Sequence, residues 1–202
     1  MIRAVPRDAS SLVAPAWFPL APVLPRAARA LGLPRVLAGA RATFFLIGEQ
    51  VQRRPALAAR IVADGHLVAL HGHRHRLQLR LRASEVQDDL VRGAAAIAEA
   101  TGVDVGWHRP PYGIYSPAGL AAAHDAGLRP LLWSRWGKDW RKFTTPARIT
   151  ARATRDLGPD DVILLHDADF YSARHSHLRT AAALPSIIAA LNRRGLGTVL
   201  PV

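Results

Sequence analysis

The chain has 202 residues, half of them hydrophobic, which is enough to bury one sizeable core and predicts a single compact domain. It has no cysteine, which excludes disulfides, thiol nucleophiles and thiolate metal sites, so any metal must be bound by nitrogen and oxygen. The net charge of +12 comes almost wholly from scattered arginines without interleaved aromatic residues, which disfavours nucleic-acid binding while leaving it as a third hypothesis.

The first apolar stretch is LVAPAWFPLAPVL, which prolines interrupt. It is shorter than the roughly 20 residues that a membrane-spanning helix needs, so no membrane span is expected. Arg3 and Arg7 precede it, but basic, apolar and cleavage regions do not follow in clean order. The sequence therefore predicts no convincing signal peptide and leaves the location open between cytoplasm and cell surface.

From about residue 40 onward, apolar runs alternate with helix-like segments. The predicted strands are ATFFLIG (42–48), HLVALH (66–71), a segment near Val105, RPLLW (129–133), DVILLH (161–166) and GTVLP (197–201). The predicted helices are 54–65, 84–102, 116–127 and 145–158.

Start and stop residues support these helices. Ser84, Ser116 and Thr145 are predicted N-caps, and Gly102 and Gly158 are predicted stops. The alternation predicts an α/β fold with a parallel sheet or barrel covered by helices, because parallel strands need long crossovers. In such folds the chemistry gathers at the carboxyl ends of the strands.

The stretch LVALHGHRHRL (67–77) places three histidines at the end of a predicted strand. His71 and His75 are four residues apart, so both rings can aim a nitrogen at one metal ion, whereas His73 is expected to point elsewhere. A polar loop with chance histidines is an equal alternative for this stretch alone.

Three more polar clusters follow predicted strands. RPPYG (109–113) is rigid at two prolines, which fixes the direction of Arg109 and of the Tyr112 N–H, although a simple turn needs no function. WGKDW contains Asp139 and Trp140. LLHD places His166 at a strand mouth, where it can exchange a proton, although alone it would more often be a core or rim histidine.

Taken together and in this order, ATFFLIG, GHLVALHGHRH, HRPPYG, DW and ILLHD resemble the NodB-type polysaccharide deacetylases, carbohydrate esterase family 4. The resemblance covers roughly residues 36–202. It implies a distorted (β/α) barrel, and the removal of N- or O-acetyl groups from sugars of chitin-like or peptidoglycan-like polymers with a divalent metal, usually zinc.

The resemblance also implies roles for individual residues. His71 and His75 would be metal ligands, His166 the general acid, and Asp139 the carboxylate that keeps this imidazole charged. The other implied positions are Trp140 and Leu165 in the acetyl pocket, the Tyr112 N–H at the oxyanion, and Arg109 paired with the catalytic base.

The chain departs from the family at its front. The family's first strand ends in a Thr-Phe-Asp-Asp-Gly-type motif that supplies the base and the third metal ligand, and no such pair is present here. The only acid before Glu49 is Asp8, outside any motif. Either residues 1–35 are a misassigned start before a deacetylase-like domain at 36–202, which we favour, or the protein is a diverged member. In either case the first strand is altered or lost.

Two principal functions follow. The first is a metal-dependent hydrolase that removes acetyl groups from sugars, impaired because the Asp base and Asp ligand are absent. Asp169 is a weak candidate for a substitute base, whereas Asp167 should face away from His166 on the strand. The second is a catalytically inactive carbohydrate-binding homologue. The segment 167–177, with His175 and His177, is expected to be an exposed loop that sets substrate choice.

Overall fold

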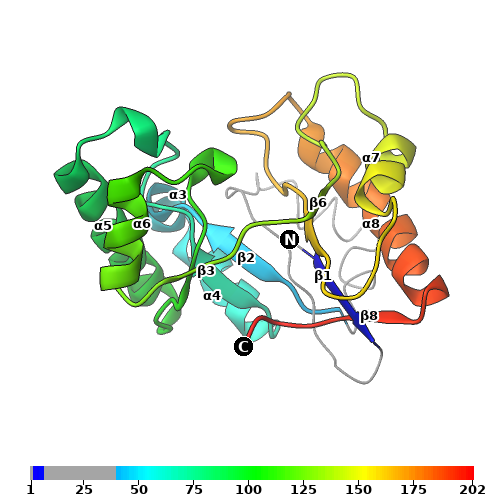
Figure 1. The fold of residues 1–202 in the computed structure, drawn as a ribbon, viewed down its shortest axis with the longest axis horizontal. Coiled ribbons are helices and arrows are strands. Elements are labelled where there is room, and N and C mark those ends of the chain that lie inside the picture. Colours follow the sequence, from blue (N-terminus) through cyan, green and yellow to red (C-terminus); the bar gives the residue numbers. More distant parts are fainter. Residues whose placement is uncertain (1, 7–39) are drawn as a thin grey trace. The chain divides into compact units, whose positions relative to one another are not determined.

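The computed structural model describes residues 2–6 and 40–202. The chain forms two compact units, one made of Met1–Phe44 and Trp133–Val202 and the other of Phe45–Leu132. Figure 1 shows a sheet and its own helices in each of them. The expected boundary between residues 35 and 36 lies outside the described residues and stays a prediction.

The unit of Phe45–Leu132 is built on a sheet with the strand order β2-β3-β4-β5. The pairs β3–β4 and β4–β5 are parallel, as the alternation predicts. The bounds are Thr43–Leu46 for β2, Leu67–Leu70 for β3, Trp107–His108 for β4 and Arg129–Pro130 for β5. Leu70 pairs with His108 and His108 with Pro130, so the segments that leave these strands start at one edge of the sheet.

Helix α5 is the central helix of this unit, since it packs against the three others. The helices are α3 (Gly48–Arg53), α4 (Pro55–Ala63), α5 (Ala83–Thr101) and α6 (Pro117–Asp125), with 3₁₀ turns η1 (Gln78–Arg80) and η2 (Pro111–Gly113). The side of α5 that faces the unit's interior contributes buried Val86, Leu90 and Ile97. Helix α5 also contacts the loop that follows β3, since the His73 N–H donates to the Asp89 carbonyl at 3.1 Å.

The other unit contains the sheet β6-β7-β1-β8. Its strands are β1 (Ile2–Pro6), β6 (Arg135–Trp136), β7 (Val162–Leu164) and β8 (Leu196–Thr198), with helices α7 (Pro146–Ala153) and α8 (Ser176–Arg193). The two helices pack together, and the core contains Ile149, Ile163, Leu165, Ile187 and Leu191. Burial of these apolar side chains is the main stabilising term of this unit.

The structure has a strand at the start of the chain, β1, and whether the family's first strand is altered or lost stays a prediction. Although β6 and β7 are parallel, β1 runs antiparallel to both β7 and β8, with Ile2 opposite Ile163 and Ala4 opposite Thr198. Asp8 and the rest of residues 7–39 lie outside the described residues.

Several helix boundaries agree with the sequence. Ser116 and Thr145 cap α6 and α7 through their hydroxyls, which accept from Gly119 and Arg148 N–H at 3.0 and 3.2 Å. Helix α5 ends at Gly102, which has a φ of +69°.

Two boundaries were predicted wrongly. Ser84 is not the N-cap of α5: the helix begins at Ala83, Arg82 is its N-cap, and the Glu85 carboxylate accepts the Arg82 N–H at 2.9 Å. Helix α7 ends at Ala153, five residues before Gly158, because the Gly158 N–H binds the Asp161 carboxylate at 2.9 Å in the turn that leads into β7.

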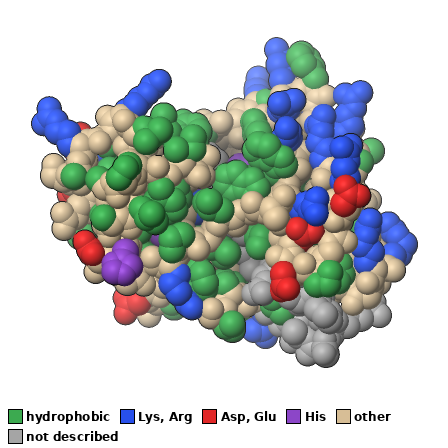
Figure 2. Space-filling model, in the orientation of Figure 1, with side chains coloured by type: hydrophobic (Ala, Val, Ile, Leu, Met, Phe, Trp, Pro, Cys, Tyr) green, Lys and Arg blue, Asp and Glu red, His purple; other side chains and the backbone are tan. Residues whose placement is uncertain are grey.

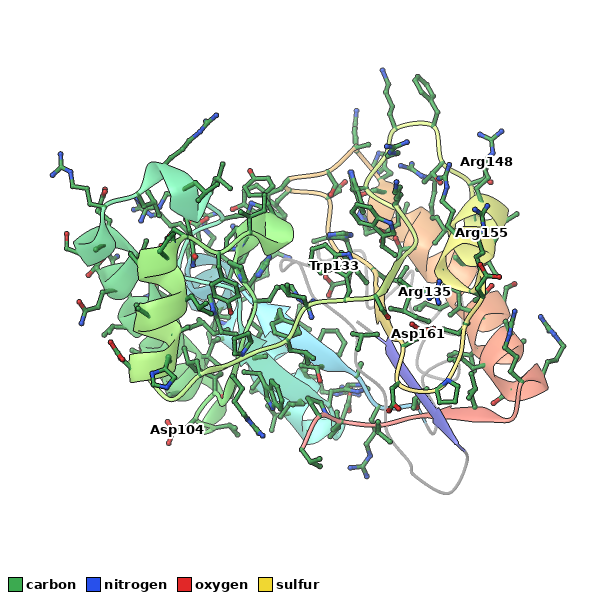
Figure 3. All side chains as sticks on the ribbon, viewed as in Figure 1. Asp104, Trp133, Arg135, Arg148, Arg155 and Asp161 are labelled. Carbon is green, nitrogen blue, oxygen red and sulfur yellow. The ribbon has the colours of Figure 1, made fainter. Side chains whose placement is uncertain are left out.

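On the face that Figure 2 shows, most of the basic side chains of the described residues lie on the right side of the view, with apolar and acidic groups between them. Figure 3 shows Arg148 and Arg155 at the surface near α7. Arg135 is instead paired with Asp161 at 3.0 Å. Within residues 2–6 and 40–202, no helix is both long enough and apolar enough to cross a membrane.

Candidate active site

The predicted site residues form two groups. One lies in the unit of Phe45–Leu132, and the other lies in the second unit, within its segment Trp133–Val202, and we call this the unit of Trp133–Val202 from here on. The first group is His71, His75, Arg109 and Tyr112, and the second is Asp139, Trp140, Leu165 and His166. The structure brings together the members of each group. That the two groups share one cavity stays a prediction.

His71 and His75 follow β3 and are both buried. Their ring centroids are 5.3 Å apart, and the His71 Nδ1 lies 2.7 Å from the Arg109 carbonyl oxygen. This hydrogen bond requires a proton on Nδ1, so a neutral His71 carries its lone pair on Nε2, the atom through which it would bind a metal. Burial, and the charge that a protonated His75 would carry, lower the pKa of His71 well below its ordinary value. Low pKa keeps the imidazole in the neutral form that binds metals.

The metal site is nevertheless incomplete in the part of the chain that the structure describes. No three His, Cys, Asp or Glu side chains are grouped there in a way that could hold a metal ion. Two imidazoles are suitable zinc ligands, but catalytic zinc sites use three protein ligands. The described residues therefore supply two of the three expected protein ligands, His71 and His75.

His73 points away from this pair, as expected. Its ring lies against Gly48 of α3, and its Nε2 is 3.3 Å from the Arg92 guanidinium on α5. Both contacts are with helices, α3 and α5. His71 and His75 instead contact each other, with ring centroids 5.3 Å apart.

The segment after β4 places Arg109 and Tyr112. The Arg109 side chain is fully buried, donates from Nε and Nη2 to the Leu131 carbonyl at 2.8 and 2.7 Å, and stacks over the Phe45 ring at 3.7 Å. Tyr112 has a φ of +63° and its ring lies edge-on to His75 at 4.6 Å. A positive φ is costly for a tyrosine and persists because the two prolines before it fix the turn.

A second pair of side chains follows β6 and β7. The Asp139 carboxylate is buried and accepts the His166 backbone N–H at 2.6 Å and the His166 Nδ1–H at 2.8 Å. Burial alone would raise the pKa of Asp139, but the adjacent His166 charge and the hydrogen bonds from His166 and Thr180 lower it overall. The carboxylate is therefore held ionised against the imidazole.

Trp140 and Leu165 lie beside this pair in different ways. The Trp140 ring is edge-on to the His166 ring at 5.2 Å and also contacts the Trp136 ring at 5.3 Å. Leu165 belongs to the hydrophobic core, and its Cδ2 occupies the place that a Cβ on Gly137 would need.

Sequence reasoning missed Thr180, whose hydroxyl donates to Asp139 at 2.8 Å from α8. A signal exists, since Ser176, Thr180, Ala183 and Ile187 recur at helical spacing and are all buried.

The interpretation of 167–177 as a loop is wrong at its end, because α8 begins at Ser176. His177 is only 13% exposed and lies 3.5 Å from the Asp169 carboxylate.

Comparison with known proteins matches residues 37–131 to the family described as polysaccharide deacetylase. A chitooligosaccharide deacetylase of Bradyrhizobium sp. (strain ANU 289) is 35% identical over 161 residues, which are 76% of this chain and 73% of that protein. Among solved structures, a family 4 carbohydrate esterase from Streptomyces lividans has a TM-score of 0.76 at 25% identity, over 96% of this chain and 91% of that one.

A second structural neighbour is described as a pseudoenzyme of carbohydrate esterase family 4, from Bacillus anthracis. It has a TM-score of 0.77 at 25% identity and is aligned over 96% of this chain and 65% of its own. Together these likenesses confirm the family resemblance and the α/β fold class predicted from the motifs.

Proposed function

Because the chain belongs to the polysaccharide deacetylase family, carbohydrate esterase family 4, we propose that it is a metal-dependent hydrolase for acetylated sugars whose activity is impaired. The observation that carries the hydrolase part is the buried His166–Asp139 pair at 2.8 Å, beside the Trp140 ring. An imidazole held by an ionised carboxylate is the arrangement that general acid–base catalysis needs.

In this proposal His166 protonates the leaving group. Its Nδ1 is committed to Asp139, so Nε2 is the atom that can deliver a proton to the sugar nitrogen or oxygen when the acetyl bond breaks. Asp139 stabilises the protonated ring, and its own hydrogen bonds from Thr180 and the His166 N–H keep it from rotating. Trp140 and Leu165 are assigned to the acetyl pocket.

His71 and His75 are the proposed ligands of the divalent metal, which we expect to be zinc. When bound, zinc would act as a Lewis acid on the acetyl carbonyl and lower the pKa of a bound water. The Tyr112 N–H is the proposed oxyanion donor, placed by a turn with little freedom. Arg109 was expected to pair with the catalytic base, and we assign it to holding the segment after β4 through Leu131.

Impairment follows from the donor set. Without an Asp-Asp pair, two neutral imidazoles replace a site that would include a carboxylate, so metal affinity should fall. The sequence also lacks the motif aspartate that the family uses as the base. We expect little or no acetate release from acetylated chito-oligomers.

The competing function is an inactive carbohydrate-binding homologue. It is favoured by the absence, among the described residues, of any group of three metal-ligating side chains. The two functions share the sugar-binding surface and differ in metal binding and turnover.

The deciding experiment pairs zinc calorimetry with an acetate assay on acetylated chito-oligomers. The proposal expects weak zinc binding that His71→Ala abolishes and His124→Ala leaves unchanged, because His124 is exposed on α6. Robust turnover with added zinc would refute the impairment. Oligomer binding with neither zinc uptake nor acetate would establish the carbohydrate-binding alternative.

A further inference from the structure

The loop between β3 and η1 is held from two sides through its backbone. On one side, the first N–H groups of α3 bind its carbonyls: Gly48 N–H donates to Gly72 O and Glu49 N–H to His73 O, both at 3.0 Å. On the other side, its N–H groups need acceptors, because buried backbone groups are costly to leave unpaired.

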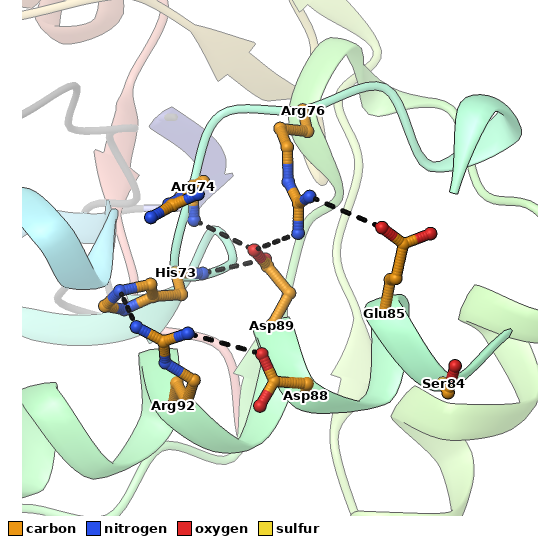
Figure 4. A pocket seen from close by; sticks show the side chains of 8 residues that line it. All are labelled: His73, Arg74, Arg76, Ser84, Glu85, Asp88, Asp89 and Arg92. Atoms are coloured by element: carbon orange, nitrogen blue, oxygen red, sulfur yellow. Dashed lines mark hydrogen bonds and ion pairs between the residues drawn. The ribbon is translucent and has the colours of Figure 1, made fainter. Parts of the chain in front are cut away.

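Asp89 on α5 supplies those acceptors. Its carboxylate accepts the His73 N–H at 2.8 Å and the Arg74 N–H at 3.1 Å, one on each oxygen, as Figure 4 shows. The His73 N–H also donates to the Asp89 main-chain carbonyl at 3.1 Å, so the Arg74 N–H is the one that depends on the carboxylate alone. The Arg76 guanidinium adds an ion pair at 3.3 Å. Hydrogen bonds to an ionised acceptor are shorter and stronger than neutral ones, so one side chain fixes three points of the loop.

The packing around Asp89 shows that its place is tightly defined. A Cβ on Gly72 would lie 2.5 Å from the Asp89 Oδ2, and one on Gly93 of α5 would lie 2.8 Å from the His73 nitrogen. The helix therefore approaches the loop at backbone distance. The Asp89 side chain is 11% exposed, whereas that of its neighbour Asp88 is 60% exposed and pairs only loosely with Arg92, at 3.5 Å.

We infer that Asp89 is a positioning residue that sets the mutual arrangement of His71 and His75. Because those imidazoles flank the braced segment, loss of the brace would widen the range of ring positions and weaken joint ligation of one ion. This inference rests on the proposed metal-binding function. Partners that orient metal ligands are worth about 10- to 100-fold in metal affinity.

The variants can be expected to fold. Asp89 borders a pocket of about 280 Å³ that is also lined by Arg74, Arg76, Glu85 and Arg92, so water can reach the freed N–H groups. Asp89→Asn keeps one acceptor oxygen and should be intermediate. Asp88→Ala removes an acid from the same turn of α5 and is the matched control, because Asp88 pairs with Arg92 and accepts no loop N–H.

The test measures two quantities on the full chain, at a temperature where circular dichroism shows every variant folded. The first is the dissociation constant for zinc by calorimetry, and the second is amide hydrogen exchange at His73 and Arg74. We expect Asp89→Ala to weaken zinc binding about 10- to 100-fold and to accelerate amide exchange at Arg74, and less so at His73, which keeps the main-chain carbonyl of residue 89 as an acceptor. Asp89→Asn should lie between, and Asp88→Ala should behave like the wild type.

The possible outcomes distinguish failure of this inference from failure of the proposed metal site on which it rests. Equal zinc affinity in Asp89→Ala and wild type would overturn the inference and leave the proposed metal site standing. Failure of the wild type to bind zinc would instead overturn the metal site, and unchanged amide exchange in Asp89→Ala would then overturn the brace itself. A purely stabilising role would lower the melting temperature without changing the zinc affinity of the folded protein, which also contradicts the inference.

Discussion

His166 on one side, and His71 and His108 on the other, stand in opposite electrostatic surroundings. In the unit of Trp133–Val202, His166 is joined to the buried Asp139 carboxylate, which is held ionised. In the unit of Phe45–Leu132, His71 is buried beside His75, and His108 is buried beside Arg109. Burial comes first among the causes that lower the pKa of both His71 and His108, and neighbouring basic groups add to it.

This difference separates two kinds of chemistry. An imidazole beside a carboxylate is stabilised when it carries a proton, which suits proton delivery. Imidazoles buried among bases are kept neutral, which suits metal ligation. The family resemblance already paired Asp139 with His166, and the structure adds the hydrogen-bond geometry and the burial of this pair.

Removing the carboxylate should have the largest effect. Asp139→Ala leaves the His166 N–H, its Nδ1–H and the Thr180 hydroxyl without their common acceptor in a buried site. Breaking one partner of a buried pair costs about 3–5 kcal/mol, so the free energy of unfolding in urea should fall by that amount.

Thr180→Val provides the graded comparison, because it removes one of the three hydrogen bonds and keeps the charge pair. It should cost about 1 kcal/mol. Equal costs for the two variants would show that the His166–Asp139 pair contributes no more than one neutral hydrogen bond.

The neutral histidines predict a pH dependence. Burial, followed by the charge of Arg109, lowers the pKa of His108 to about 3. The unfolded chain, with an ordinary value of about 6.5, therefore binds more protons between these two values, and stability is lost as pH falls through this window. By pH 5 the loss from His108 should be about 2 kcal/mol.

The measurement is urea unfolding at pH 7 and pH 5. His108→Gln removes the titrating ring while keeping a polar group near the Tyr115 hydroxyl, which lies 2.8 Å from the His108 Nδ1. This variant should lose less stability than the wild type between the two pH values. His124→Gln, at a side chain 87% exposed, should not differ from the wild type, and an identical pH slope in all three proteins would contradict a buried neutral His108.

Local sequence signals predicted four of the helices, α4 to α7, because these signals depend on neighbouring residues, but they did not predict α3 or α8. The caps at Ser116 and Thr145 and the strands around Phe45 and Val68 needed no long-range information. The start of α5 was missed because Glu85 caps it by reaching back to Arg82, which leaves Ser84 inside the helix.

The candidate-site residues were predictable only because several short motifs occur in one order along the sequence. Spacing identified His71 and His75, but Asp89 acts 14 residues after the second of them, through a backbone contact that no periodicity encodes. Asp88 and Asp89 are indistinguishable by type, and burial alone separates them. The same holds for Thr180, which reaches Asp139 from a helix 41 residues further along the chain.

The smallest expected effect distinguishes two contributions to the loss of stability at the loop that carries His71 and His75: backbone strain and side-chain crowding. Gly72 and Gly102 both have positive φ, at +86° and +69°, but a Cβ on Gly72 would meet the Asp89 carboxylate while one on Gly102 would meet nothing within 4 Å. Gly102→Ala should cost about 1 kcal/mol from the left-handed backbone alone. Gly72→Ala should cost about 1–3 kcal/mol, because Asp89 must also move, and only this variant should speed amide exchange at His73. Equal losses in urea, with unchanged exchange at His73, would mean that the loop adapts without displacing the carboxylate.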